Sequence, residues 1–254
     1  MTPADRAGPL TVLETIDSTS EEARRRLEAG DTGPFWIGAR EQTKGRGRQG
    51  KPWSTRPGNL AVTGLMPFEG TPAEAARTGF AVSLGVADTV AFLAHGASIS
   101  IKWPNDVLLE GGKVSGILLE NLGAMADGRL ALTIGIGINL AHHPDPAPGM
   151  WPPTSLNDVT GATPLMDDVL PVLVDNVTRA LTNDRILGFE TTRTAWLARA
   201  ARLGEAIDVK LPTETLRGNF RTIDDTGALV LQTSSGLRSI AAADVFFPEM
   251  TRCS

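Results

Sequence analysis

The chain has 254 residues, of which 41% are hydrophobic and 21% charged, and this length allows one large domain with a small appendage or two domains. A formal net charge of −5 argues against nucleic-acid binding by the whole surface, and the single cysteine, Cys253, excludes an internal disulfide and a cysteine-based metal cluster. The N-terminal residues contain no secretory leader and no apolar run reaches membrane-spanning length, which predicts a cytoplasmic protein without a membrane partner.

Hydrophobic periodicity divides the first part of the chain into strands and helices. Strands are predicted at residues 10–16, 35–41, 59–66, 98–109, 113–120 and 129–140. A helix follows the first strand and begins at Asp17 or Ser18, either of which can cap it. A long alanine-rich helix begins at a capping box formed by Thr71 and Glu74 and ends near Gly96. This long helix is predicted to form a wall of the core.

Residues 44–53 read KGRGRQGKPW and follow the second predicted strand. Their glycines can adopt positive φ and let backbone amides approach a ligand closely. Arg46 and Arg48 carry paired donors that match phosphate or carboxylate oxygens, and Trp53 offers a flat face to an aromatic ring. This glycine-rich loop therefore predicts binding of an anion that also carries a ring. The alternative is a solvated basic loop or a nucleic-acid patch.

Two phosphate-binding motifs are nearly matched by this loop and are rejected on context. Gly45, Gly47 and Gly50 spell the dinucleotide fingerprint G-x-G-x-x-G, which requires a helix to begin at the loop. The prolines that follow, Pro52 and Pro57, prevent such a helix. A P-loop would need a hydroxyl residue where Pro52 stands. Phosphate is therefore expected to bind this loop in a different way.

Polar residues at strand ends and glycines inside strands extend the set of candidates. The hydroxyls at the first strand-to-helix junction are either helix caps or ligand contacts: Ser18, Thr19 and Ser20. At a break made by Pro104, three polar residues form either a ligand site or an ordinary turn: Lys102, Asn105 and Asp106. Gly135 and Gly137 lie two apart within one strand, which suggests a ligand against that face.

The second half of the chain begins with a proline-rich surface loop at residues 141–165. His142 and His143 lie in it, but with 3 histidines in the chain no metal site is predicted. Helices are predicted at residues 165–183 and 188–203. Short strands that predict a small antiparallel barrel follow at residues 206–211, 216–223, 228–232, 237–240 and 244–247. The chain is therefore divided into residues 1–203 and 204–254.

Four segments together resemble the biotin–protein ligase family. They read DSTS at 17–20, QTKGRGRQGKPW at 42–53, KWPNDVLLEGGKVSGILLE at 102–120 and IGIGIN at 134–139. The resemblance implies an α+β fold with a mixed β-sheet catalytic domain flanked by helices, similar to class II aminoacyl-tRNA synthetases, and a small C-terminal SH3-like β-barrel. Ser20 departs from the asparagine that is usual in the family. Because the first strand begins near Leu10, neither the DNA-binding repressor domain of some members nor DNA binding is expected.

The resemblance also implies which residues bind the substrates. Hydrogen bonds to the ureido ring of biotin are implied for Ser18, Thr19 and Gln42. The other residues implied for biotin are Gly45, Arg46, Lys113, Gly116 and Gly135. The residues implied for ATP are Arg48, Trp53, Asn105, Lys113 and Asn139, with Trp53 stacked on adenine. Arg46, Arg48 and Lys113 are implied as catalytic cations, and Asp106 as an orienting group or base.

A member of this family activates biotin with ATP to biotinyl-5′-AMP and transfers it to a lysine of a biotin carboxyl carrier protein, such as that of acetyl-CoA carboxylase. The cations bring two anionic reactants together, Mg²⁺ neutralises the departing pyrophosphate, and a closed loop protects the mixed anhydride from water. Monomer and homodimer both stay open. The alternatives are a lipoate or octanoyl-protein ligase of related fold and a non-catalytic biotin-sensing protein.

Overall fold

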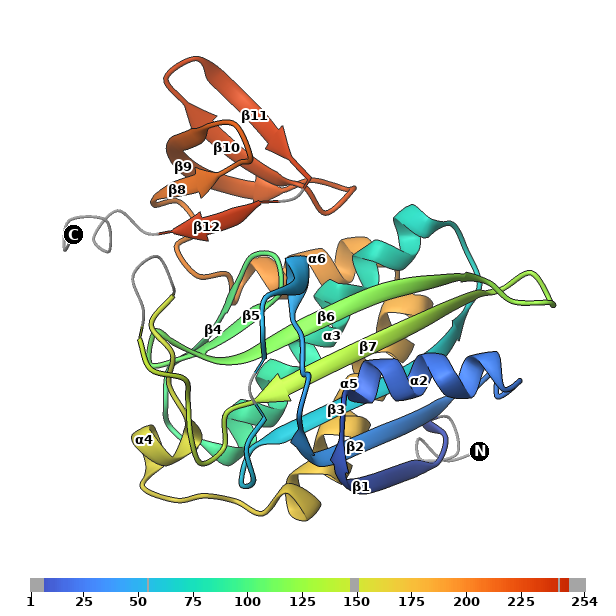
Figure 1. The fold of residues 1–254 in the computed structure, drawn as a ribbon. Helices are drawn as coiled ribbons and strands as arrows, with labels where there is room; N and C mark the ends of the chain where they lie inside the picture. The colour runs from blue at the N-terminus through green and yellow to red at the C-terminus, as the bar shows by residue number, and fades with distance from the viewer. Residues whose placement is uncertain (1–6, 54, 147–150, 242, 247–254) are drawn as a thin grey trace.

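A computed structural model describes residues 7–53, 55–146, 151–241 and 243–246, so Cys253 lies outside the described residues. In this part of the chain, seven strands form one sheet in the order β1-β2-β3-β7-β6-β5-β4 (Figure 1). β1 and β2 are parallel, and the other neighbouring strands are antiparallel. The bounds are β1 (Leu10–Ile16), β2 (Phe35–Gln42), β3 (Leu60–Phe68), β4 (Ile99–Lys102), β5 (Asp106–Leu109), β6 (Gly112–Ala124) and β7 (Leu130–Ile138). The predicted mixed sheet flanked by helices is confirmed.

Alternating side chains of β2 divide the core between the two faces of the sheet. Trp36 belongs to the larger cluster, on the face covered by α3 (Pro72–Leu93) and α5 (Met166–Leu187). Phe35 and Ile37 belong to a smaller cluster with Ala23 of α2 (Thr19–Glu28). Figure 1 shows α2 on the near side of the sheet and α3 and α5 behind it. A single short helix thus covers part of the near face, and the polar residues described below gather beside it.

The long alanine-rich helix is confirmed as α3, and its capping box forms as predicted. Thr71 Oγ1 accepts a hydrogen bond from the backbone N–H of Glu74, whose carboxylate accepts one from the N–H of Thr71. Gly85 meets α5 closely, because a Cβ there would lie less than 3.0 Å from the backbone of Val177. By length and composition α3 could cross a membrane, contrary to the expectation from the sequence, yet 56% of its apolar window is buried inside the protein. We read α3 as a core helix.

Thr71→Ala is expected to lower the free energy of unfolding by about 1 kcal/mol, because the N–H of Glu74 loses its acceptor. Thermal unfolding followed by circular dichroism should show a Tm lower by about 2–4 °C. Thr213→Ala, in an exposed turn, is the matched control and should leave the Tm unchanged. Equal losses in the two variants would contradict the capping role.

The helix α6 (Phe189–Leu197) ends before the predicted residue 203. The reason is an interaction with the edge of the sheet: Ile101 of β4 donates its N–H to the carbonyl of Arg199 and accepts a hydrogen bond from the N–H of Ala201. These backbone groups are committed to β4 and cannot continue a helix. The predicted strand at residues 98–109 is likewise two strands, β4 and β5, which form a hairpin around the predicted break.

A second sheet follows α6, and Figure 1 shows it above one end of the first. Its order is β11-β10-β9-β8-β12, all antiparallel, with bounds β8 (Ala206–Lys210), β9 (Thr215–Ile223), β10 (Leu229–Thr233), β11 (Gly236–Ile240) and β12 (Asp244–Phe246). β11 and β12 are its edges, so the closed barrel stays a prediction, and residue 247 lies outside the described residues. The ring of Trp196 lies between those of Phe80 and Phe220, at centroid distances of 5.3 and 6.5 Å, and so joins the two sheets through one apolar core.

Candidate functional site

A buried cluster of hydroxyls joins the start of α2 to β3. Thr19 Oγ1 lies 2.8 Å from Thr63 Oγ1 and donates to Gln42 Oε1 at 3.0 Å, and Ser20 Oγ lies 3.2 Å from Thr63 Oγ1. A Cβ on Gly135 would lie 3.3 Å from Ser20 Oγ, so the glycine brings β7 against the same cluster. Thr63 was missed by the sequence reasoning, although a threonine inside an apolar strand is a signal for a polar contact. These groups form a fixed wall of donors and acceptors.

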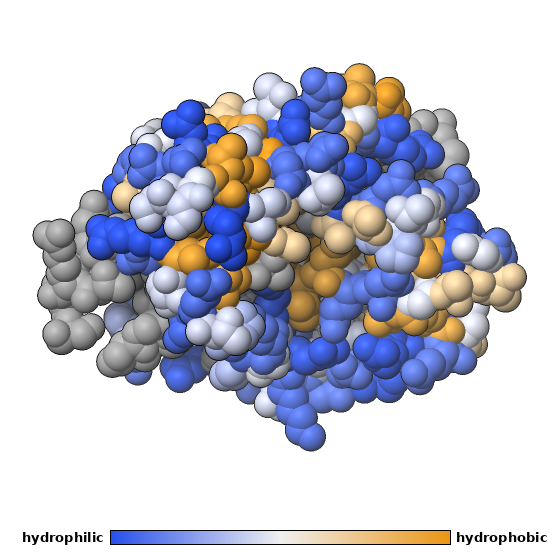
Figure 2. All heavy atoms as spheres, turned by 90° about the horizontal axis from the view of Figure 1, so that it is seen from above, coloured by the Kyte–Doolittle hydropathy of each residue, from blue (hydrophilic) through white to orange (hydrophobic). Residues whose placement is uncertain are grey.

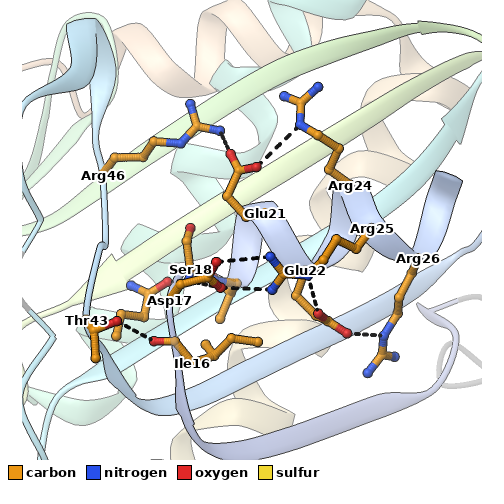
Figure 3. Close-up of polar contacts among 12 residues, drawn as sticks. Ile16, Asp17, Ser18, Glu21, Glu22, Arg24, Arg25, Arg26, Thr43 and Arg46 are labelled. Atoms are coloured by element: carbon orange, nitrogen blue, oxygen red, sulfur yellow. Dashed lines mark hydrogen bonds and ion pairs between the residues drawn. The ribbon is translucent and has the colours of Figure 1, made fainter.

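Ser18 is confirmed as the N-cap residue of α2, but its side chain makes no capping hydrogen bond. The side chain of Asp17 accepts hydrogen bonds from the guanidinium of Arg25, which hold the pKa of Asp17 at about 2 (Figure 3). Ser18 itself is buried, and its backbone N–H donates to Asp17 Oδ1 at 2.7 Å. The ion pair therefore fixes the chain where it enters the hydroxyl cluster.

The glycine-rich loop folds back on itself. The N–H of Trp53 donates to the carbonyl of Gly45 at 2.9 Å, and a Cβ on Gly45 would lie less than 3.0 Å from the carbonyl of Trp53 and from Gln42 Nε2. No α-helix begins at the loop; residues Arg48–Gly50 make only one 3₁₀ turn, in which Gln49 has φ 57°. Rejection of the dinucleotide fingerprint is therefore confirmed. Glycine is required at position 45 because the two arms of the loop touch there.

The indole of Trp53 lies against a platform made by two glycines on neighbouring strands, Gly116 of β6 and Gly137 of β7, which are partners in the sheet. A Cβ on Gly137 would lie less than 3.0 Å from three atoms of the indole, and one on Gly116 would lie 3.0 Å from it. Lys113 Nζ lies 5.7 Å from the centroid of an indole ring. The structure thus brings Trp53, Gly116 and Lys113 together. Because the two glycines have no side chains, the sheet presents a flat surface there, on which the indole or the ring of a ligand can lie.

Arg46 is held between two carboxylates. Its guanidinium lies 2.6 Å from Glu21 of α2 and 3.0 Å from Glu120 of β6. Figure 3 shows Glu21 between Arg46 and Arg24, whose Nε lies 3.7 Å from it. Neither glutamate was among the predicted site residues. An anion that binds Arg46 must therefore compete with two acidic side chains.

Arg48 and Asn105 are also brought together, since Arg48 Nη1 donates to Asn105 Oδ1 at 3.1 Å. Asn105 in turn donates through Nδ2 to the carbonyl of Ile117 at 2.7 Å. The pair places the second arginine of the loop over the β4–β5 turn. This position suits a phosphate that lies between the loop and the turn.

Asn139 directly follows β7 and supports a loop. Its Nδ2 donates to the carbonyl of Thr154 at 2.9 Å, next to α4 (Leu156–Thr160), a helix that was not predicted. A capping box of Ser155 and Asp158 begins this helix and is visible in the sequence as S-x-x-D. The contacts of Asn139 are structural here, and its role in binding adenylate stays a prediction.

Asp106 lies between two lysines. Its Oδ2 is 3.2 Å from Lys102 Nζ and its Oδ1 is 2.7 Å from Lys113 Nζ. Burial acts to raise the pKa of Asp106, but the two ammonium groups outweigh it and the pKa is lowered. A carboxylate with a lowered pKa is a weak base, so this geometry favours an orienting role over proton abstraction. Of the three side chains only Lys113 is partly exposed, so it is the ammonium that an anion can reach.

The donor set does not fit a metal held by the protein alone. Across the described ranges, no group of three or more His, Cys, Asp or Glu side chains could hold a metal ion. The carboxylates beside these cations are already paired with lysine or arginine: Asp106, Glu21 and Glu120. Mg²⁺ commonly binds through substrate phosphates with few protein ligands. The sequence predicted no metal site at His142 and His143. In the part of the chain that the structure describes, the acidic partner of His143 is Asp158, at 3.4 Å.

Seen from above, the molecular surface has apolar residues in a central hollow and hydrophilic residues around it (Figure 2). The partly exposed cations of the site come from the loop and from β6, the buried Lys102 comes from β4, and the hydroxyls come from α2 and β3. Such a site presents hydrogen-bonding groups at one end and positive charge at the other. It is suited to a ligand with a polar head and an anionic tail.

Comparison with known proteins agrees with this description. Residues 12–139 match the model of the "Biotin/lipoate A/B protein ligase family", and residues 203–247 match the "Biotin protein ligase C terminal domain". The chain is 44% identical to a biotin–[acetyl-CoA-carboxylase] ligase of Paracoccus denitrificans over 93% of this chain and 99% of the relative. It is 29% identical to a ligase of the same name from Mycobacterium tuberculosis over 93% and 88% of the two chains. A solved biotin protein ligase from Aquifex aeolicus, in complex with biotin and ATP, superposes with a TM-score of 0.77 at 26% identity, covering 93% of this chain and 97% of that one. The chain therefore belongs to the biotin/lipoate A/B protein ligase family.

Proposed function

We propose that this chain is a biotin–protein ligase. It activates biotin with ATP to biotinyl-5′-AMP and pyrophosphate, and then transfers biotin to the ε-amine of a lysine on a biotin carboxyl carrier protein, such as that of acetyl-CoA carboxylase. The observation that carries the proposal is the convergence of the glycine-rich loop and Lys113 on one glycine platform, with the hydroxyl cluster against Gly135 of β7. Full-length similarity to a ligase of that name supports it.

Biotin lies with its ureido ring against the hydroxyl cluster. Thr19, Ser18 and Gln42 offer donors and acceptors to the ureido N–H and C=O groups, and Thr63 holds the cluster in place. A site built to pair with polar groups discriminates strongly against ligands that lack them. Gly45, Gly116 and Gly135 let the backbone come close to the ligand and complete the pocket; a Cβ on each would meet a neighbour.

The first step requires the carboxylate of biotin to approach the α-phosphate of ATP, although both are anionic. Lys113, Arg46 and Arg48 place positive charge around the point where the reactants meet. The carboxylate oxygen attacks phosphorus, the bond to the bridging oxygen breaks, and pyrophosphate leaves with the electron pair. Arg46 exchanges Glu21 and Glu120 for the ligand, so binding and closure of the loop are coupled.

ATP places its adenine against Trp53 and its phosphates near Arg48, with Asn105 and Asn139 beside the adenylate. In the second step the acceptor amine attacks the acyl carbon, the bond from that carbon to the phosphate oxygen breaks, and AMP leaves. Protons lost by the amine pass to solvent. Asp106, whose lowered pKa makes it a weak base, orients the acceptor ammonium at the oxygen that Lys113 leaves when it turns to the ligand.

Several features of the protein around this site belong to the same proposal. Residues 1–203 form the catalytic domain, and residues 204–254 form an SH3-like barrel that packs on it through Trp196 and Phe220. Mg²⁺ would enter with the phosphates of ATP and would neutralise charge on the departing pyrophosphate. Because ATP is the cosubstrate, the reaction is placed in the cytoplasm.

A lipoate ligase is the second candidate, because the matched family description includes lipoate ligases. A lipoyl chain has no ureido group to pair with Thr19 and Gln42, which favours biotin. The decisive experiment is transfer of labelled biotin to a purified carrier domain with and without ATP, with unlabelled biotin or lipoate as competitor. We expect ATP-dependent labelling that biotin suppresses and lipoate does not. Suppression by lipoate would favour the second candidate, and binding of biotin without turnover would identify a sensor.

A further inference from the structure

Lys102 contacts neither reactant in the steps above, although it is the most deeply buried lysine near the site. The side chains of Lys102 and Asp106 are 8% and 9% exposed, whereas the side chain of Lys113 is 28% exposed. Lys102 ends β4 and Asp106 begins β5, and the two are partners across the hairpin. The spacing of the two residues therefore places a buried ammonium directly against a buried carboxylate, at 3.2 Å.

The surroundings of Lys102 hold this ammonium in place. Its Nζ lies 5.1 Å from the ring centroid of Trp151, and the charge of Asp244 on β12 also favours its protonated form. Burial lowers the pKa of Lys102, and Asp106 acts in the opposite direction. A buried ion pair of this kind could often be replaced by apolar residues without loss of stability. Stability alone therefore does not explain a lysine here.

The two lysines differ in which side of Asp106 they occupy. Lys113 contacts Oδ1 and lies beside the indole of Trp53 at the glycine platform, whereas Lys102 contacts Oδ2 from inside the protein. When Lys113 turns to the anionic ligand, Asp106 keeps only Lys102. Oδ1, which is buried beneath Lys113 in the structure, is then the oxygen left without a cation.

We propose that Lys102 is a positioning residue for biotin transfer: it holds Asp106 by Oδ2 while Oδ1, released by Lys113, receives the ammonium of the acceptor lysine. The inference rests on the proposed function and adds no covalent step, since Lys102 touches neither the acyl group nor the amine. Lys102 keeps the carboxylate ionised and in one orientation during the second half-reaction.

Lys102→Met tests this with two separate measurements on the full chain. One is pyrophosphate release from biotin and ATP, and the other is single-turnover transfer from preformed biotinyl-adenylate to a carrier domain, followed from pH 5.5 to 9. The pKa of Asp106 is lowered in the wild type, so its acid limb lies below this pH range. Loss of one neighbouring cation raises that pKa, so the acid limb of the transfer profile moves to higher pH. We expect transfer near neutral pH to fall roughly tenfold or more, with pyrophosphate release close to wild type.

Three further variants separate positioning from mere support of the fold. Lys102→Arg keeps the charge and should retain the acid limb, and Lys210→Met on an exposed part of β8 should change nothing. In an Asp106→Asn background, Lys102→Met should cause no further loss of transfer, because its effect acts through Asp106. This double variant also removes the unpaired charge if the single variant folds poorly.

The inference is overturned if both half-reactions fall equally without a shift of the acid limb, or if the losses from Lys102→Met and Asp106→Asn add. It is also overturned if Lys102→Met transfers biotin at the wild-type rate. Failure of the proposed function looks different, because the wild-type chain itself would then release no pyrophosphate and label no carrier.

Discussion

Lys113→Ala is expected to lower pyrophosphate release from biotin and ATP by roughly 10²–10³-fold while the fold is retained. The side chain lies at the glycine platform and is partly exposed, so its removal opens no cavity in the core. In the proposed mechanism this ammonium offsets the repulsion between the biotin carboxylate and the α-phosphate. The loss should appear in kcat more than in KM, because charge builds up in the transition state.

The matched control for this variant is Lys210→Ala, which removes an exposed lysine from β8 in the second sheet. Both variants should keep the wild-type circular dichroism spectrum and Tm within error. Pyrophosphate release by the Lys113 variant at the rate of the control would remove Lys113 from the mechanism.

Trp53→Ala is expected to weaken the binding of ATP by about 1–3 kcal/mol, or roughly 5- to 150-fold in Kd, because the adenine base loses its stacking partner. The indole covers Gly116 and Gly137 in the structure, so removing it uncovers the platform for biotin. Biotin affinity should therefore stay the same or become tighter. Isothermal titration of each ligand separates the two effects, and weaker binding confined to biotin would contradict the stacking role.

Gly137→Ala is the companion to this variant. A Cβ at position 137 would overlap the indole, so the ring must leave the platform even in the absence of ligand. The emission of Trp53 is obtained by subtracting the spectrum of the matching Trp53→Phe chain, which keeps the other tryptophans. In the Gly137→Ala variant this emission should shift toward that of an exposed indole. An unchanged spectrum would mean that the ring does not rest on the glycines.

Local rules predicted the elements of this fold well. The first strand has the predicted bounds, and the capping box of Thr71 and Glu74 begins α3 as expected, because both depend on residues close in sequence. The end of α6 did not follow from local rules, because it is set by hydrogen bonds between Ile101 and residues almost one hundred positions away. The barrel predicted from the sequence would require the edge strands β11 and β12 to pair, which periodicity does not report, so its closure stays a prediction.

The candidate site divides in the same way. The motifs identified Arg46, Lys113 and Asp106, and the structure brings the last two within 2.7 Å. The partners of Arg46, Glu21 and Glu120, were not predicted, because each is an ordinary charged residue until the fold brings it to the loop. Sequence motifs thus predict which side chains bind the ligand. The side chains that pair with them in the absence of ligand become known only from the fold.

The account depends on a cationic loop and one lysine that force two anionic reactants together on the glycine platform. Its most direct test is a crystal structure of the protein with biotinyl-5′-AMP. We predict that the ligand lies beneath residues 42–53, with its acyl phosphate against Lys113 and with Arg46 released from Glu21 and Glu120. A ligand bound elsewhere, or bound with Arg46 still paired to both glutamates and Lys113 turned away, would contradict it.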